Sequence, residues 1–510
     1  MPHRNRRVIL ILVDGLRPDV AEAMLAGGEL PHLARMVTQG GTTRGLTVFP
    51  STTTVAYLPL LTGCTPATSN VPSIRWLDRS SYSGRWWRNR EAVRSYCGYQ
   101  AGLVDRDIAT DVRTMFEHLS ESTGLFTSIS RGLPMRRDSL RGARKWLGTA
   151  GHFLAPFQQI TDDLVGRQLL REIEGPSRFI FAVFPAVDGI SHLTAPDGPA
   201  VLGALRRLDA VVGTMRDRLA ARGELDESLI LLVSDHGASP VHTHFDLADW
   251  FRLNGVPTLA HPNLWTRHPR AAVMVAGNGS AMVYARPDNP RRERWPMGRL
   301  REPDAFGTSG DLVTALAAEP AIGLLAAEDD HGGLSLLSSD GDATLSRCGA
   351  RIVYQPGIGD PLALGDKREA TTDEWLEAAG GDLYPDAGPQ LLDLFRSPRT
   401  GDLVVAANEG FDLRDAFEVP EHRAGHGSLT RSHMQIPIWS SHRLPVDVAG
   451  APIPMRSVDL FPSMAAWLGL DITTPIDGRL VWRPQALAAV GVNATRRSGR
   501  PSRVVAGVAS

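Results

Sequence analysis

The stretch Val8-Ile9-Leu10-Ile11-Leu12-Val13-Asp14-Gly15 decides the fold, because six apolar residues run without alternation into an aspartate and a glycine. A continuous apolar run of this length is typical of a parallel strand that is buried on both faces. Two similar runs follow: Phe179–Phe184 leads to Asp188, and Leu229–Val233 leads to Asp235. The carboxyl ends of parallel strands meet at one crevice of an open α/β sheet, so these acidic residues are expected to lie together. We therefore predict an α/β fold with a large central, mostly parallel sheet flanked by helices.

The chain changes character about half-way along. Between residues 246 and 399 prolines, glycines and charges become more frequent and the strand-like pieces are short, which predicts an inserted cap subdomain. The catalytic core is then expected in residues 1–245 and 400–495. Residues 496–510 are rich in Arg, Ser, Gly and Val and are expected to form a flexible tail.

The overall composition restricts the class of partner. The 510 residues carry a formal net charge of -2, which provides no basic field for a nucleic-acid polymer. The apolar run at Val8–Val13 is too short for a signal-peptide core or a membrane span, and no uncharged apolar run of about 18 residues occurs elsewhere. The three cysteines are far apart, so they indicate neither a disulfide framework nor a cysteine metal site. We expect a soluble, cytoplasmic protein that acts on a small molecule and not on a membrane; the sequence does not indicate an oligomeric state.

Histidines accompany the acidic residues at the ends of the later strands. The chain contains Asp188-x-x-x-His192, and His236 directly follows Asp235. His426 lies between two glycines, which suits close packing against a metal. Each motif alone is a weak indication, and the order and spacing of the whole set favour a metal site.

Other residues compete with members of this set. His422 and His433 lie close to His426 in the sequence. The tripeptide Asp330-His331-Gly332 repeats the Asp-His-Gly sequence, but residues 326–329 before it are poor strand material. We therefore expect a loop there, with no part in the site.

In this set of motifs the chain resembles the alkaline phosphatase superfamily, in particular its type I phosphodiesterase/nucleotide pyrophosphatase family. The matching segments are Ile9–Gly15, Phe49–Thr53 with Thr62-Gly63 nine residues later, Asp188-x-x-x-His192, Ser234–Gly237 and His426–Ser428. The resemblance covers residues 8 to about 470 and is loose after Asp246.

The resemblance implies two divalent metal ions. It places Asp14, Thr53, Asp235 and His236 around one ion, and Asp188, His192 and His426 around the other. The family usually holds zinc, and mixed histidine and carboxylate ligation fits zinc on chemical grounds as well; manganese is the alternative.

The resemblance also implies a threonine nucleophile. Among Thr52, Thr53 and Thr54, the spacing to Thr62 selects Thr53, and Thr53–Leu61 has the composition of a short helix. A threonine hydroxyl is a weak nucleophile at neutral pH, and coordination to a divalent metal lowers its pKa. Attack by Thr53 would cleave a phosphodiester or pyrophosphate bond of a small-molecule substrate through a phospho-threonine, which water then hydrolyses.

The chain departs from the family pattern at the substrate. The family often has asparagine three residues after the nucleophile, where this chain has Ala56. The group that holds the phosphate is therefore open, and Thr52 and Arg75 are the candidates. Cys64 begins a sequence like a sulfatase motif, but this motif ends in Thr68 and not in arginine, which argues against a sulfatase.

Three alternatives are weighed against the phosphodiesterase. A phosphomonoesterase or phosphonate hydrolase would use the same chemistry. An isomerase like the cofactor-independent phosphoglycerate mutases would use serine where this chain has Thr53. A metal-binding homologue without catalysis is less consistent with a complete set of ligands and a hydroxyl at the nucleophile position.

Overall fold

The first sheet has seven strands, with β1 in the middle of the order β2-β21-β8-β1-β7-β5-β6. Its strands are β1 (Arg7–Val13), β2 (Gly41–Leu46), β5 (Ser122–Leu125), β6 (Asp138–Ser139), β7 (Phe179–Phe184), β8 (Ser228–Val233) and β21 (Gln435–Ser440). The pairs from β8 to β6 are parallel, and β21 pairs antiparallel with β8 and with β2. The computed structural model describes residues 6–289, 293–414 and 420–484, so the expected tail at 496–510 lies outside the described residues. The predicted α/β class with a large central sheet is confirmed.

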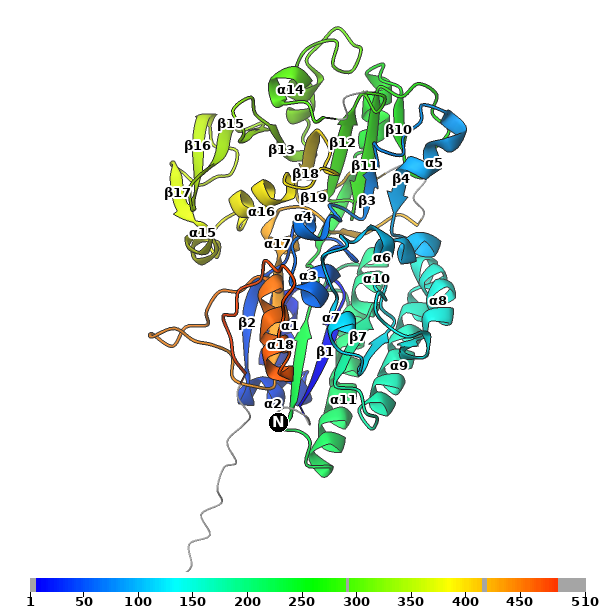
Figure 1. Ribbon diagram of the computed structural model, residues 1–510, viewed down its shortest axis with the longest axis vertical. Helices are drawn as coiled ribbons and strands as arrows, with labels where there is room; N and C mark the ends of the chain where they lie inside the picture. Colours follow the sequence, from blue (N-terminus) through cyan, green and yellow to red (C-terminus); the bar gives the residue numbers. More distant parts are fainter. Residues whose placement is uncertain (1–5, 290–292, 415–419, 485–510) are drawn as a thin grey trace, which may run out of the picture.

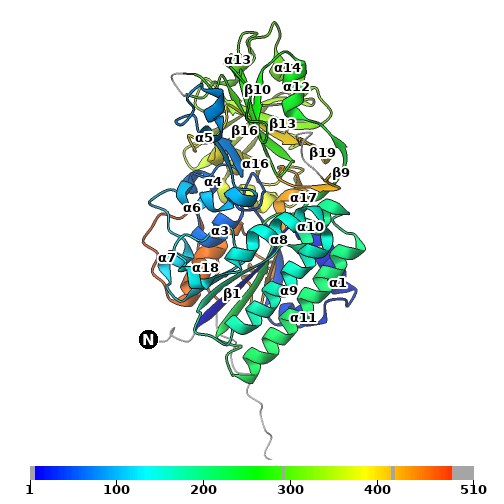
Figure 2. The same ribbon diagram turned by 90° about the vertical axis from the view of Figure 1, so that its right-hand side faces the viewer.

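Helices cover β1 on both sides, which explains its unbroken apolar run. Val8 and every second residue after it pack against α3 (Tyr57–Thr62) and α18 (Leu460–Leu468). The alternate residues from Ile9 pack against the helices of the opposite face (Figure 1, Figure 2). These helices are α1 (Pro18–Ala26), α2 (Pro31–Gln39), α9 (Ala155–Glu172), α10 (Ala186–Leu193) and α11 (Pro199–Ala221).

The three central strands end at the same level. Val13 of β1 pairs with Phe184 of β7, and Leu12 of β1 pairs with Val233 of β8. The residues that follow these strands therefore emerge together at one edge of the sheet, as predicted for the carboxyl ends of parallel strands.

A second, largely antiparallel sheet lies above that edge in Figure 1. Its strands are β10 (Thr258–Ala260), β11 (Ala271–Ala276), β12 (Ser280–Ala285), β13 (Ile322–Glu328), β14 (Leu334–Ser338), β15 (Gly341–Cys348), β16 (Arg351–Gly359), β17 (Arg368–Thr371) and β18 (Leu403–Ala407). One face is covered by α12 (Leu247–Leu253), α13 (Met297–Leu300) and α14 (Leu312–Ala317). The other face joins the apolar core that contains Val8, so one continuous core connects both sheets. The role of this part of the chain as a cap stays a prediction.

A small three-stranded sheet lies between the two large ones and carries segments that lead to the site. It has the order β19-β9-β20 and consists of β9 (Ser239–His244), β19 (Gly410–Asp412) and β20 (Ala424–Gly425). A two-stranded sheet pairs β3 (Arg75–Leu77) with β4 (Val93–Ser95). The remaining α-helices are α4 (Pro66–Ser69), α5 (Asn89–Ala92), α6 (Val104–Asp107), α7 (Met115–His118), α8 (Arg141–Phe153), α15 (Thr372–Ala378), α16 (Ala387–Leu394) and α17 (Arg431–Met434).

Three local expectations differ from the structure. β18 pairs with β12 and β13 of the second sheet, although the sequence placed residues 400–495 with the core. Residues 326–328, which were expected to be poor strand material, belong to β13, which β14 and β18 stabilise from both sides, whereas Asp330-His331-Gly332 lies in the turn between β13 and β14, as expected. The helix expected from Thr53 begins only at Tyr57, because Thr54 has a positive φ of 71°, which is incompatible with a right-handed helix.

Candidate metal centre

The structure brings all seven predicted metal-site residues to the carboxyl edge of the first sheet. Each lies just beyond the end of a strand, or on or just before a helix. They are Asp14 after β1, Thr53 before α3, Asp188 and His192 on α10, Asp235 and His236 after β8, and His426 after β20.

The hydroxyl of Thr53 lies against a carboxylate and an imidazole. Its Oγ1 is 3.2 Å from Nε2 of His236 and 3.5 Å from Oδ1 of Asp14. The buried Tyr57 donates its hydroxyl proton to Oδ2 of Asp14 at 2.6 Å. Tyr57 therefore fixes the orientation of the carboxylate that faces Thr53.

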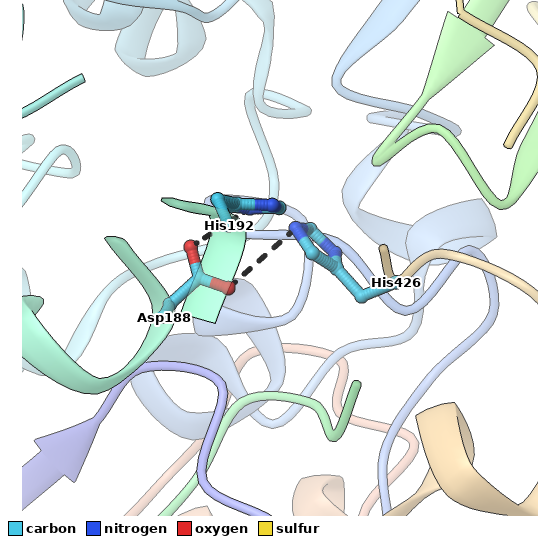
Figure 3. A group of neighbouring side chains, drawn as sticks. All are labelled: Asp188, His192 and His426. Atoms are coloured by element: carbon cyan, nitrogen blue, oxygen red, sulfur yellow. Dashed lines mark ion pairs between the residues drawn. The ribbon is translucent and has the colours of Figure 1, made fainter. Parts of the chain in front are cut away.

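Asp188 connects two histidines from distant parts of the chain (Figure 3). Its Oδ2 is 3.2 Å from Nε2 of His192, and its Oδ1 is 3.9 Å from Nε2 of His426. Within the described residues this Oδ1 is buried and has no hydrogen-bond donor. Gly15, at a positive φ of 69°, passes so close that a Cβ there would lie 2.8 Å from Oδ1. A buried carboxylate oxygen without a donor is unfavourable unless a cation lies next to it.

The candidate ligand atoms form two groups that share Asp188. The groups are Asp188, His192 and His426, and Asp14, Asp188 and His236, and the ligand atoms of each lie within 4.8 Å of one another. Asp235 adjoins the second group, with Oδ2 3.2 Å from Nε2 of His236. The resemblance assigned Asp188 to one ion, whereas here it lies between both groups.

Each imidazole of the cluster is oriented by a backbone carbonyl. Nδ1 lies 2.8 Å from the Ala424 oxygen in His192, 3.0 Å from the Gly237 oxygen in His236 and 3.1 Å from the Ser51 oxygen in His426. A carbonyl only accepts, so Nδ1 carries a proton in each ring, and in a neutral ring the lone pair of Nε2 then faces the carboxylates. Lone pairs facing carboxylate oxygens repel one another, and a metal ion between them removes this repulsion. This is the arrangement in which histidine binds metals.

The electrostatics of the cluster also favour cations. Burial and Asp188 raise the pKa of Asp235 to about 8, and burial, then Asp235 and Asp188, raise the pKa of Asp14 well above its usual range. Burial acts to raise the pKa of Asp188 too, but neighbouring imidazoles, His192 foremost, bring it below the usual value. Burial lowers the pKa of His236 to about 4, so its ring is neutral at pH 7. In the described part of the chain, no arginine or lysine forms an ion pair with these carboxylates.

The loop that carries Thr53 offers donors beside the hydroxyl. Among the described residues, the backbone N–H groups of Thr53 and Thr54 have no acceptor. The hydroxyl of Thr54 lies 3.0 Å from that of Ser128, which follows β5. Thr52, a predicted substrate contact, is fully buried, and its Oγ1 has no partner within the described chain. Free amide groups at this position suit the oxygens of a bound phosphate.

Arg75, the other predicted substrate contact, begins β3 and points toward the second sheet. Its Nη1 donates to the carbonyl oxygen of Val275 at 3.2 Å, and Nη2 is 3.7 Å from Sγ of Cys97. These contacts place Arg75 beside the end of β11, and its role toward a phosphate stays a prediction.

Several residues that support the site were not found from the sequence. Tyr57 lies four residues after Thr53, and nothing in that spacing marks it as the partner of a carboxylate. His433 accepts the Ser428 N–H at Nδ1 and lies 2.8 Å from the Ser239 hydroxyl at Nε2. It therefore braces the loops that carry His236 and His426. A Gly-Asn-Gly sequence at residues 277–279 is a hairpin signal between two apolar pieces, and this hairpin also reaches the site.

Comparison with known proteins decides the family. The profile of the type I phosphodiesterase/nucleotide pyrophosphatase family matches residues 8–298. The chain belongs to this family. Phosphodiesterases of this family are metal-dependent hydrolases of phosphodiester or pyrophosphate bonds, and this chain is accordingly an enzyme of that class. His426 lies beyond the matched residues.

Solved structures share the phosphodiesterase fold over almost the whole chain. Murine ectonucleotide pyrophosphatase/phosphodiesterase 5 is 14% identical with a TM-score of 0.54, and the match covers 93% of this chain and 98% of that one. Phosphonoacetate hydrolase from Sinorhizobium meliloti 1021 is 15% identical with a TM-score of 0.53, covering 92% and 97%. At these identities the likeness shows the fold alone. No curated protein sequence matches this phosphodiesterase significantly. Among the described residues, no helix combines the length and apolar character needed to cross a bilayer.

Proposed function

We propose that this chain is a two-metal phosphohydrolase that cleaves phosphodiester or pyrophosphate bonds of small molecules through a phospho-threonine at Thr53. The observation that supports the proposal is the buried cluster around the Thr53 hydroxyl, in which three imidazoles with Nδ1 held by backbone carbonyls turn Nε2 toward three carboxylates. The family membership supports the class of reaction.

The same cluster supplies the candidate metal ligands. Asp188, His192 and His426 would hold one ion, and Asp14, Asp235, His236 and the Thr53 hydroxyl would hold the other. Zinc suits this mixture of imidazole and carboxylate, with manganese as the alternative. Divalent cations bound here would polarise phosphoryl oxygens and lower the pKa of a coordinated hydroxyl.

The protein groups around Thr53 can carry out the two half-reactions. Oγ1 of Thr53 attacks phosphorus and the bond to the leaving oxygen breaks, while the threonine proton passes to Oδ1 of Asp14 and the leaving oxygen takes a proton from water. The N–H groups of Thr53 and Thr54 donate to the phosphoryl oxygens. Water then attacks the phosphorus on Thr53 from the side that the leaving group has vacated, which releases the remaining half of the substrate as a phosphate monoester and restores the hydroxyl.

The charge around the site favours a diester over a monoester. A monoester carries one negative charge more than a diester. Within the described residues the cluster carboxylates form ion pairs with histidines only, so no arginine or lysine is held among them to offset the additional charge of the substrate. Among the structural neighbours, a variant of the murine protein described as inactive is complexed with AMP, and the bacterial hydrolase is complexed with phosphonoacetate. A small phosphoester is therefore the proposed substrate class, and a phosphonate is the competing one. The family does not favour the phosphomonoesterase or the isomerase.

The test combines metal analysis with a substrate panel. Protein purified without chelator should contain two divalent ions per chain. Its kcat/KM should be higher for bis-p-nitrophenyl phosphate than for p-nitrophenyl phosphate or phosphonoacetate. A metal-free protein whose activity resists chelators would refute the two-metal proposal. A preference for the monoester or the phosphonate would refute the substrate class.

The nucleophile is tested by removing one oxygen. Thr53→Ala should abolish turnover while both ions stay bound, because the other ligands remain. Thr53→Ser, the matched control, keeps a hydroxyl and should keep measurable activity. If Thr53→Ala retains more than a few per cent of the activity, a neighbouring hydroxyl or water attacks the substrate directly.

A further inference from the structure

The short segment that ends at His426 contacts the metal-ligand candidate His192 on its backbone and on its ring. The Arg423 N–H donates to the carbonyl oxygen of His192 at 2.7 Å, and Nδ1 of His192 donates to the carbonyl oxygen of Ala424 at 2.8 Å. The ring of His422 lies against the ring of His192, with centroids 4.3 Å apart. We call residues 422–426 the clasp, because they hold the backbone, the Nδ1 atom and one ring face of His192.

The clasp is attached to the tip of the β11–β12 hairpin, which belongs to the second sheet. The His426 N–H donates to the Gly277 oxygen at 3.1 Å, and the Gly279 N–H donates to the His426 oxygen at 2.7 Å. The fit is tight: a Cβ at Gly277 would lie 2.7 Å from Nδ1 of His426, and a Cβ at Gly279 would lie 2.5 Å from the His426 oxygen. The backbone of the hairpin tip therefore fixes one end of the clasp.

Asn278, between these glycines, reaches the other end of the clasp. Its Nδ2 donates to Nδ1 of His422 at 3.1 Å, and both side chains are buried. Because Nδ1 accepts this bond, His422 carries its proton on Nε2, and its ring has one fixed orientation against His192. Asn278 has a positive φ of 64°, a conformation that asparagine and glycine adopt more readily than other residues.

We propose that Asn278 is the positioning residue for the metal site formed by Asp188, His192 and His426. Its amide orients His422, which supports His192, while its backbone lies next to His426. It has no such contact with Asp14 or His236 in the described structure. This proposal rests on the proposed function, because it assigns Asn278 to one of the two proposed ions. Partners of this kind behind metal ligands change metal affinity by about 10- to 100-fold when removed.

The variant that isolates the side chain is Asn278→Gly. Glycine keeps the positive φ and the backbone bonds to His426, and it removes only the amide that holds His422. The matched control is Asn70→Gly. Asn70 also has a positive φ, 59°, and its amide oxygen accepts from the Ser397 hydroxyl at a place outside the cluster.

Zinc affinities are measured by competition with a chelator of known affinity, at several buffered zinc concentrations. The wild-type protein and Asn70→Gly should bind two ions with the same affinities. Asn278→Gly should bind one ion with unchanged affinity and the other about 10- to 100-fold more weakly. His422→Ala should reproduce this selective loss, and the double variant should lose no more than either single variant, because both act through one contact.

Two results would overturn the proposal. Either Asn278→Gly binds both ions as the wild type does, or it weakens both ions equally, as a general loss of structure would. If Asn278→Gly does not fold, His422→Ala decides between these results. A wild-type protein that binds fewer than two ions would instead refute the proposed function, on which this inference depends.

Discussion

Removal of the metal ions should make the stability of the protein fall between pH 6.5 and pH 8. The cause is Asp235, whose pKa is about 8 in the folded protein against a model-compound value of 3.8. Between these values the folded protein binds one proton more than the unfolded chain. The free energy of unfolding therefore decreases with rising pH, by up to about 1.4 kcal/mol per pH unit. Asp14 shifts in the same direction and adds to the decrease.

The histidines change the stability of the folded protein in the opposite direction, but only at lower pH. His236 has a folded pKa of about 4 against 6.5 for the free side chain, so here the unfolded chain binds the extra proton. This contribution raises stability with pH up to about 6.5 and is constant above it, and His426 shifts in the same direction. Asp188, with its lowered pKa, is ionised in both states throughout this range. Above pH 6.5 only the carboxylates with a raised pKa change the free energy of unfolding. Asp235 alone lowers this free energy by about 2 kcal/mol between pH 6.5 and pH 8.

The assay is urea unfolding of chelator-treated protein, followed by tryptophan fluorescence at pH 6.5, 7.2 and 8. Asp235→Asn should make the decrease smaller, because asparagine does not titrate and only the contribution of Asp14 remains at this pair. Saturating zinc should reverse the trend, since ions bind deprotonated ligands and stabilise the folded state more at higher pH. The reasoning is refuted if the metal-free protein is equally stable at pH 6.5 and pH 8, or if Asp235→Asn keeps the full decrease.

Two further substitutions test the contacts around the cluster. Tyr57→Phe removes only the hydroxyl that donates to Asp14, so kcat/KM measured at saturating zinc should fall about 10- to 100-fold. The far-ultraviolet circular dichroism should stay unchanged. An unchanged kcat/KM would exclude a catalytic role for this hydrogen bond. Gly15→Ala combines a positive φ with a Cβ 2.8 Å from Asp188, so urea unfolding should show a loss of about 2–4 kcal/mol. A neutral Gly15→Ala variant would show that Asp188 has room to move.

The sequence predicted the parts of the fold that depend on local pattern. The unbroken apolar run from Val8 identified the central strand because both faces of β1 are covered, and the runs before Asp188 and Asp235 did the same for β7 and β8. The convergence of the site residues followed from the geometry of parallel strands. The assignment of each residue to an ion stays a prediction.

The features that the sequence did not predict depend on contacts between distant segments. The composition of β18 identifies a strand but not its partners, and its partners β12 and β13 belong to the second sheet. Residues 326–328 have a composition that is unfavourable for a strand, yet all three pair with β14, and Ala326 also pairs with β18. The bond from Tyr57 to Asp14 and the contact of Asn278 with His422 join residues far apart in the chain, and no local pattern encodes such pairs.

The attachment of His426 to both the nucleophile loop and the second sheet has a consequence for biosynthesis. Ser51 and the hairpin at residues 277–279 both precede His426 in the chain. They are therefore synthesised before the histidine that they contact in the folded protein. Until that histidine leaves the exit tunnel, Asp188 and His192 lack the third member of their group. Under the proposed function, the site formed by Asp188, His192 and His426 is therefore complete only after residue 426 has left the ribosome, whereas Asp14, Asp188 and His236 are available earlier.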